Sequence, residues 1–332
     1  MKKIRHGIIG FSVGQWHAEE FEKVPEIEVT AVADISPDLL RMAKDKGIKK
    51  LYSNYQELCQ DPDIDSVSVC LPNFLHAPAV IKALEAGKHV LCEKPLAHNL
   101  EDGKRIAEAA GKSDKLVMLA MKFRFLPETA FIVDKFRKGE FGDIYYSYTT
   151  YLRPLGGIPN KPSFICRKNS GGGSMIDNGV HFLDLQWHLM GHPKPVHALG
   201  MTCAKFGPSL SKDFDVDDFA AGMIRFSNGS TAVLENAWAC MTQKGTFGLR
   251  YLGTKAGATI WPFSVSEGRD GKVEDITPDL AGYKHVSQFQ HFADCILKGV
   301  KCISPIEEGL ELLKMLDALY SSSKQGKGVD IP

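Results

Sequence analysis

Apolar and polar positions follow two alternating periods along the first third of the chain. Short apolar runs at 4–9, 28–33, 65–71, 89–92 and 116–120 are typical of buried strands. Between them lie segments with apolar residues at helical spacing, such as 78–86, which ends at Gly87. Repeated alternation of strands and helices predicts a parallel sheet covered by helices.

From about residue 143 the pattern changes. The segments 144–152, 196–206, 219–226 and 230–240 have the composition of strands, and Asn228-Gly229 between the last two is a strong hairpin signal. Consecutive strands of this kind predict an antiparallel sheet. We therefore divide this α/β chain into a first domain at 1–121 and a second α/β domain at 122–332.

Charge and cysteine content narrow the class of protein. The chain has 40 basic and 40 acidic residues, so its formal net charge is zero, which argues against nucleic acid or an anionic membrane as the main partner. No apolar stretch is long enough for a signal sequence or a membrane span. The eight cysteines form no Cys-x-x-Cys pair, and Cys70 and Cys92 lie within apolar runs. We expect reduced thiols, a cytoplasmic protein and no metal site.

A turn with two glycines follows the first strand. In parallel sheets of this type, ligands bind outside the carboxyl ends of the strands. The turn is Gly10-Phe11-Ser12-Val13-Gly14, ahead of a helix whose N-terminal amides favour a pyrophosphate. Asp34 ends the second strand, where a carboxylate can accept both ribose hydroxyls and repel a 2′-phosphate. The turn is one residue shorter than Gly-x-Gly-x-x-Gly and has Ser12 as its middle residue, yet its position favours NAD, with NADP the less favoured cofactor.

Two further strings contain groups suited to proton transfer. Glu93-Lys94-Pro95 ends an apolar run, so Lys94 lies at the carboxyl end of a strand. Asp177 and His181 are four residues apart and share one face of a predicted helix. A lysine, a histidine and an orienting aspartate can take a proton from a hydroxyl while a hydride leaves its carbon. The alternatives are an ordinary surface lysine at Lys94 and a core histidine at His181 that is satisfied by an aspartate.

The polar stripe of this helix continues toward its C-terminus. Asp184 and His188 follow Asp177 and His181 on the same face, with apolar residues on both flanks. We interpret Asp184 as an anchor of the helix or of a neighbouring loop. Arg124, shortly after the last strand of the first domain, is expected to brace the domain junction.

Four stretches make the chain similar to the glucose–fructose oxidoreductase / inositol dehydrogenase / MocA family. They are Gly7-Ile8-Ile9-Gly10 with His17 downstream, Leu71-Pro72-Asn73-Phe74-Leu75-His76, the segment 83–96 around Glu93-Lys94-Pro95, and the segment 171–184 around Asp177-Asn178-Gly179-Val180-His181. The resemblance implies a Rossmann domain followed by an α/β domain with a large open, mostly antiparallel sheet. It also implies NAD(P)-dependent oxidation or reduction of sugars, cyclitols and related polyols.

The resemblance further implies roles for single residues. Lys94 matches the family lysine near nicotinamide and substrate, Asp177 the active-site aspartate, and His181 the proton-transfer histidine, while Pro95 is expected to follow a cis bond. The predicted cofactor contacts are Gly10, Phe11, Ser12, Val13, Asp34, Ile35, Leu71, Asn73, His76, Glu93 and Lys94. The predicted substrate contacts are Lys94, Lys122, Trp16, Arg153, Asn160, Tyr283 and His285.

The sequence therefore favours an NAD-dependent oxidoreductase that transfers a hydride between nicotinamide and a carbinol carbon of a small polyhydroxylated substrate. Two alternatives stay open: an NAD-dependent glycosidase that oxidises, eliminates and reduces in one cycle, and a non-catalytic dinucleotide-binding sensor. Because one face of a large sheet tends to aggregate when it is exposed, we also predict a homodimer or homotetramer packed through the sheet of the second domain.

Overall fold

The computed structural model describes residues 3–269, 271–283 and 286–332, and its chain divides into two compact units. The first unit comprises Met1–Lys122 and Val286–Leu313, and the second comprises Phe123–His285 and Lys314–Pro332. The first unit thus includes a late segment, 286–313, that the sequence analysis assigned to the second domain. The division falls within the helix α12 (Ile306–Gln325).

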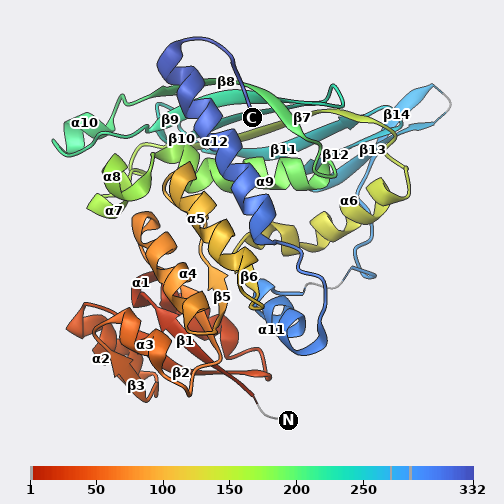
Figure 1. Ribbon diagram of the computed structural model, residues 1–332. Coiled ribbons are helices and arrows are strands. Elements are labelled where there is room, and N and C mark those ends of the chain that lie inside the picture. Colours follow the sequence, from red (N-terminus) through yellow and green to blue (C-terminus); the bar gives the residue numbers. More distant parts are fainter. Residues whose placement is uncertain (1–2, 270, 284–285) are drawn as a thin grey trace. The chain divides into compact units, whose positions relative to one another are not determined.

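The first unit contains a six-stranded parallel sheet in the order β3-β2-β1-β4-β5-β6 (Figure 1). Its strands are β1 (Ile4–Ile9), β2 (Ile27–Ala33), β3 (Lys50–Tyr52), β4 (Ser66–Val69), β5 (His89–Cys92) and β6 (Val117–Leu119). Its helices are α1 (Phe11–Phe21), α2 (Pro37–Asp45), α3 (Tyr55–Gln60), η1 (Asn73–Leu75), α4 (His76–Glu85), α5 (Leu100–Gly111) and α11 (Gln288–Lys298).

The strand order reverses between β1 and β4. The chain moves outward from β1 to β3 on one side and from β4 to β6 on the other, and right-handed crossovers then put α1 and α4 on opposite faces. A reversal of this kind is the topological switch point at which doubly wound sheets bind ligands. The predicted parallel sheet is confirmed, and the short elements β3 and α3 are additions that the apolar pattern did not reveal.

The late segment 286–313 completes the first unit. Phe289 and Phe292 of α11 are fully buried, with Phe289 against Phe21 at a ring distance of 4.8 Å and Phe292 against His6 at 6.1 Å. After α11, the amide of Leu119 in β6 donates to the carbonyl of Ser304 at 3.0 Å. The segment therefore covers part of the core formed by β1 and α1, and it also pairs with the edge of the sheet.

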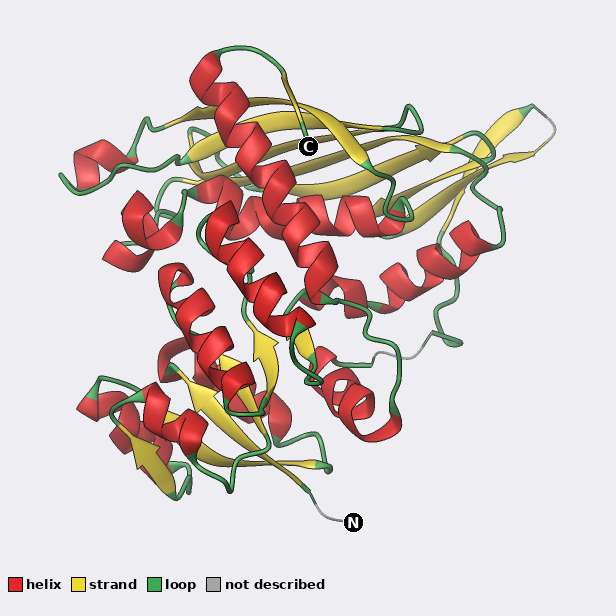
Figure 2. Ribbon diagram, in the orientation of Figure 1, coloured by secondary structure: helices red, strands yellow, loops and turns green. Residues whose placement is uncertain are grey.

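The second unit contains a nine-stranded sheet in the order β14-β13-β12-β11-β7-β10-β9-β8-β15 (Figure 2). Its strands are β7 (Ile144–Pro154), β8 (Pro195–Cys203), β9 (Phe219–Phe226), β10 (Thr231–Cys240), β11 (Thr246–Gly253), β12 (Ala256–Ile260), β13 (Ser264–Arg269), β14 (Lys272–Ile276) and β15 (Val329–Asp330). Its helical segments before α12 are η2 (Lys122–Phe125), α6 (Pro127–Arg137), α7 (Pro162–Ile165), α8 (Arg167–Ser170), η3 (Met175–Gly179), α9 (Val180–Leu189) and α10 (Gly207–Leu210).

Most neighbouring strands of this sheet are antiparallel, as predicted. The predicted hairpin joins β9 and β10, and Gly229 in its turn has a left-handed φ of 86°. The central pair β7 and β10 is parallel, so the sheet is mixed. The α-helix α9 packs on β7 and β10, and Leu319 of α12 lies against Gly200 and Gly222, which are register partners in β8 and β9.

Candidate functional site

The turn after β1 is fitted to glycine at two positions. Gly10 has a φ of 87°, and a Cβ there would lie 2.5 Å from the carbonyl oxygen of Cys70. A Cβ on Gly14 would lie 2.4 Å from Cγ2 of Ile8, so this glycine lets α1 approach β1 closely. The helix begins directly at Phe11, which explains the shortened turn. The side chain of Phe11 is fully buried, and Ser12 is exposed at the first turn.

Asp34 holds this turn at the end of β2. Its Oδ2 accepts the amide N–H of Phe11 at 2.7 Å, and its Oδ1 accepts the amide N–H of Ser36 at 2.8 Å. The neighbouring Ile35 is 92% exposed. The carboxylate and the first turn of α1 therefore lie together at the switch point, where a dinucleotide presents its ribose and pyrophosphate. The residues present fit such a cofactor, because α1 begins directly after the turn and a strand-end carboxylate lies beside its first residue.

A buried chain of polar side chains crosses the sheet to the strand end that bears Lys94. His6 contacts Ser66 Oγ through Nδ1 at 2.7 Å and Ser68 Oγ through Nε2 at 2.9 Å. Ser68 Oγ lies 2.9 Å from Nδ1 of His17, and Nε2 of His17 lies 2.9 Å from Oε1 of Glu93. The first four of these residues are fully buried, and the Glu93 side chain is 14% exposed.

The carboxylate of Glu93 is the acceptor at one end of this series of hydrogen bonds. Burial raises the pKa of Glu93, but the hydrogen bond and charge of His17, together with Lys94, outweigh burial and hold the pKa below its usual value. An acceptor-only carboxylate requires Nε2–H on His17. The directions of the remaining bonds, from His17 through Ser68 and His6 to Ser66, follow the tautomers of the two rings. Burial, and secondarily the charge of His17, lowers the pKa of His6 well below its usual value, so this ring stays neutral.

His76 fixes the other side of the same loop. Its Nδ1 lies 2.8 Å from the carbonyl oxygen of Pro95 and its Nε2 lies 2.8 Å from that of Leu71. The ring is fully buried, and burial lowers its pKa despite these two bonds. The Lys94–Pro95 bond is cis, which confirms the expectation from the family resemblance. His76 thus acts on the loop through the backbone, whereas Leu71, Asn73 and Lys94 remain partly exposed.

In the second unit, Asp177 lies in a π-helix rather than in the regular α-helix that its spacing predicts. This π-helix, η3, precedes α9 directly. Asp217 holds its start: Oδ1 accepts the amide of Gly173 at 2.8 Å, and Oδ2 accepts the amide of Met175 at 2.9 Å. Gly173 has no room for a side chain, since a Cβ there would lie 1.9 Å from the carbonyl oxygen of Asp217. Single π-turns are frequent at functional sites.

Asp177 and His181 are both half-buried. The indole Nε1–H of Trp238, on β10, donates to Oδ2 of Asp177 at 2.9 Å, and this ring is itself fully buried. The ring of His181 packs against Phe123 at 5.4 Å. The hydrogen bond from Trp238 therefore orients the carboxylate of Asp177, and the ring of Phe123 packs against the imidazole of His181.

Asp184 forms a closed ion pair with Arg124. The guanidinium donates from Nε at 2.9 Å to Oδ2 and from a terminal nitrogen at 2.6 Å to Oδ1, and the two side chains are only 1% and 2% exposed. The predicted anchoring role of Asp184 is confirmed. His188 contacts His192 at 3.3 Å. Burial, followed by the charge of Arg124, lowers the pKa of His188 well below its usual value, so this part of the polar stripe has the character of a core.

The predicted substrate contacts have different surroundings. Trp16 is 39% exposed and packs on Phe289 at 5.2 Å. Lys122 and Asn160 are exposed, and Arg153 is half-buried at the end of β7. The hydroxyl of Tyr283 donates to Asp134 of α6 at 2.7 Å, which occupies that side chain locally. His285 lies outside the described residues.

Four supporting residues escaped the sequence analysis as site residues: His6, His17, Asp217 and Trp238. His17 was visible only as part of a family motif, and its partner Glu93 is 76 positions away. Asp217 sits between strands without any local signal. Their place in or next to apolar segments could have indicated that His6 and His17 are buried and need polar partners, but the sequence does not show which residues these partners are.

A parallel sheet with a topological switch point, a glycine turn and a strand-end aspartate defines the class of dinucleotide-binding Rossmann proteins. Two family models match the chain: "Oxidoreductase family, NAD-binding Rossmann fold" over residues 4–121 and "GFO/IDH/MocA C-terminal domain" over residues 132–259. The chain belongs to the glucose–fructose oxidoreductase / inositol dehydrogenase / MocA family of oxidoreductases.

Named relatives are similar over much of the chain. D-glucoside 3-dehydrogenase of Escherichia coli (strain K12) is 28% identical, with 95% of this chain and 93% of the relative covered. Myo-inositol 2-dehydrogenase of Thermotoga maritima is 31% identical, with 70% and 68% covered. A solved structure of levoglucosan dehydrogenase in complex with NADH and L-sorbose superposes with a TM-score of 0.89 at 24% identity, covering 100% of both chains, which shows the shared fold. Among the described residues, every helix is too short or too polar to cross a membrane.

Proposed function

We propose that this oxidoreductase is an NAD-dependent dehydrogenase acting on a secondary hydroxyl of a sugar, cyclitol or related polyol. The main support is the Glu93-Lys94-Pro95 loop, which two buried histidines position from opposite sides, in a family chain that also has Asp177 and His181. The names of the relatives, which are dehydrogenases of glucosides and inositols, support the substrate class.

The proposed chemistry assigns one role to each residue. His181 takes the proton of the substrate hydroxyl, since an imidazole can accept a proton in one direction of the reaction and return it in the other. Asp177, oriented by Trp238, favours one tautomer of His181 and stabilises the imidazolium. Lys94 donates to the reacting oxygen and stabilises the charge that develops there. NAD, when bound, supplies the hydride chemistry.

The cofactor preference follows from the end of β2. Asp34 presents a carboxylate at the position of the adenosine ribose, where it favours two free hydroxyls over a 2′-phosphate. Gly10, Phe11, Ser12 and Val13 of the turn and the exposed Ile35 complete the proposed contacts to the pyrophosphate and adenosine, while the amide of Phe11 itself donates to Asp34. Leu71, Asn73 and Glu93 are proposed to line the nicotinamide side. Exchange of Asp34 for serine is expected to narrow the difference in Kd between NAD and NADP.

The deciding experiment is a screen of polyols and aldoses with NAD and NADP, followed by variants. Lys94→Ala and His181→Ala are each expected to lower kcat by about 10²-fold or more, while NAD binding persists. If both residues act on the same step, the double variant loses much less than the product of the single losses. Lys112→Ala and His197→Ala, at surface positions, are the matched controls.

Other outcomes of this screen identify other functions. Near-normal turnover in both variants removes the proposed mechanism. Release of an aglycone without net NADH identifies the glycosidase, and tight NAD binding with no substrate among the polyols and ketoses identifies a sensor. Among the predicted substrate contacts, Trp16, Lys122, Arg153 and Asn160 are the partly or fully exposed side chains to exchange first, for changes in KM.

We also propose a homodimer, or a homotetramer built from two such dimers, through the open face of the nine-stranded sheet. Gly200 and Gly222 face Leu319, so their strand neighbours Leu199 and Met223 point to the opposite face. Register extends this row through Val233, Tyr148 and Arg250. Leu199 is 46% exposed and Met201 is 52% exposed. A monomer in sedimentation at micromolar concentration contradicts this proposal, and Leu199→Glu with Met201→Glu is expected to dissociate the assembly.

A cytoplasmic location is proposed from the thiols. All eight cysteines belong to described residues and are free, including Cys203 and Cys240 in the partly exposed class. Free cysteines in this number are typical of a reducing compartment. Fractionation of cells that express the full chain tests the location.

A further inference from the structure

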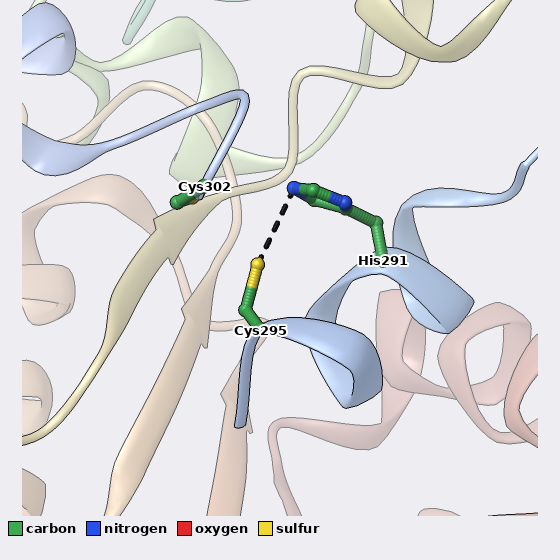
Figure 3. A group of neighbouring side chains, drawn as sticks. All are labelled: His291, Cys295 and Cys302. Atoms are coloured by element: carbon green, nitrogen blue, oxygen red, sulfur yellow. Dashed lines mark hydrogen bonds between the residues drawn. The ribbon is translucent and has the colours of Figure 1, made fainter. Parts of the chain in front are cut away.

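A cluster of one histidine and two cysteines lies in the late segment that completes the first unit. His291 and Cys295 are four residues apart on α11, and Cys302 follows in the loop between α11 and α12. The ligand atoms of the three side chains all lie within 4.8 Å of one another. Figure 3 shows His291 and Cys295 facing each other, with Nε2 and Sγ 3.3 Å apart and Cys302 beside them.

We propose that His291, Cys295 and Cys302 bind one zinc ion. Two thiolates and an imidazole form a donor set that binds Zn²⁺ in preference to hard cations such as Mg²⁺. Zinc bonds of about 2.3 Å to sulfur and about 2.0 Å to nitrogen put tetrahedral ligand atoms roughly 3.5 Å apart. The His291–Cys295 distance already matches this value, and the remaining distances, none above 4.8 Å, require contractions of at most about 1.3 Å, within reach of side-chain rotation.

The surroundings of the cluster are compatible with binding. His291 is 4% exposed, which limits the motion of the ring, whereas Cys295 and Cys302 are partly exposed and give an ion a path of entry. Nε2 of His291 accepts the amide N–H of Ile303 at 3.0 Å, so this nitrogen carries no proton and its lone pair is the one that a metal ion would take over from the amide. Coordination replaces the hydrogen bonds at Nε2, and both thiols release their protons. A water molecule or a fourth donor from solution fills the last tetrahedral position.

Zinc at this place would join two parts of the late segment. α11 covers the core through Phe289 and Phe292, whereas the loop after Cys302 pairs with β6 through Ser304. The ion would therefore fix the segment that returns to the first unit. The cysteines show no Cys-x-x-Cys spacing, so the sequence predicted no metal site. This set instead combines His291 and Cys295, four residues apart on a helix, with a cysteine in the following loop. The inference is independent of the proposed redox reaction.

The test uses the full chain, reduced and stripped of metal, titrated with Zn²⁺ against a chromophoric chelator of micromolar affinity. We expect one equivalent of zinc per chain, and thiolate-to-metal charge-transfer bands when Co²⁺ replaces zinc. Cys295→Ser and Cys302→Ser are expected to abolish this equivalent. The double variant Cys203→Ser/Cys240→Ser removes two partly exposed cysteines of the second unit and is expected to retain it.

A second measurement needs no variant. In the wild-type chain, Zn²⁺ is expected to slow alkylation of Cys295 and Cys302 at least tenfold, as read by peptide mass spectrometry, and to leave Cys203 and Cys240 unchanged. Zinc is also expected to raise the unfolding temperature of the wild-type chain. Absence of zinc binding, equal binding by Cys302→Ser, or protection at the control cysteines overturns the proposal. A Cys295–Cys302 disulfide whose reduced form takes up no zinc overturns it as well.

Discussion

The two units bury polar groups in opposite ways. In the first unit, buried histidines and serines form a chain of hydrogen bonds from Ser66 to Glu93, and this chain ends beside the partly exposed Lys94. In the second unit, Arg124 and Asp184 form a charged pair that is closed on all sides. Hydrogen bonds between buried side chains can orient a loop at modest energetic cost. A fully buried ion pair anchors a helix, and loss of either partner then lowers the free energy of unfolding strongly.

The largest expected effect is on the ion pair. Arg124→Met leaves the Asp184 carboxylate buried and unpaired, so we expect the free energy of unfolding to fall by about 3–5 kcal/mol. Denaturant unfolding followed by fluorescence measures this loss. In the double variant Arg124→Met/Asp184→Leu, most of the loss should be recovered, because no charge remains buried. A decrease below about 1 kcal/mol in the single variant, comparable to that of the surface change Lys112→Ala, would falsify the anchoring role.

Removing the hydrogen bonds of His17 is expected to have a smaller effect on stability than the loss of the ion pair, and a larger effect on function. His17→Phe retains ring packing against Phe21 and Phe289 but removes both hydrogen bonds. We expect a loss of about 1–3 kcal/mol in unfolding free energy and a decrease in kcat, because Glu93 no longer holds the Lys94 loop. Ser66→Ala, at the far end of the chain, is the control and should leave kcat within twofold. Equal losses of kcat in both variants contradict a specific role of His17 in holding the Lys94 loop through Glu93.

Trp238 tests the corresponding support in the second unit. Trp238→Phe keeps an aromatic ring against Phe214 but removes the N–H that orients Asp177. We expect kcat to fall about tenfold, which corresponds to about 1.4 kcal/mol in the barrier, with the Kd of NAD unchanged. The pH profile of kcat should shift, since the Asp177 carboxylate is less well held beside His181. An unchanged profile together with a lower melting temperature indicates a purely structural role.

The smallest expected effect concerns acid stability near the ion pair. Burial, followed by the charge of Arg124, lowers the pKa of His192 to about 4. Because the unfolded chain binds this proton near pH 6.5 and the folded chain does not, stability falls as the pH drops below about 6.5. His192→Asn suits the left-handed φ of 58° and removes the group. Between pH 7 and 5.5 the variant should lose about 1 kcal/mol less than the wild type in urea unfolding. Parallel pH curves contradict this account.

The sequence predicted the fold where local patterns decide it. Apolar runs bounded by turn residues marked five strands of the first sheet, and Asn228-Gly229 marked the β9–β10 hairpin. β13 and β14 escaped prediction because they form a largely exposed hairpin with little apolar alternation. The parallel pairing of β7 with β10 depends on contacts between distant segments, which local periodicity does not contain.

The candidate site divides in the same way. Lys94, Asp177 and His181 stood out because each lies in a continuous motif. Their supports, His17 for Glu93 and Trp238 for Asp177, are separated from them by 76 and 61 positions. Spacing predicted a regular helix at Asp177, whereas Asp217 holds a π-turn there through backbone amides. Contacts of this kind leave no trace in local spacing.

The late segment 286–313 has a consequence for how this protein is made. On the ribosome, β1 to β6 emerge first, and the pocket for Phe289 and Phe292 stays uncovered until 123–285 has been translated. The nascent amino-terminal segment 1–122 therefore exposes apolar surface to chaperones until 286–313 has been made. A fragment that stops at residue 122 is expected to aggregate, and co-expression of a peptide spanning 286–313 is expected to keep it in solution.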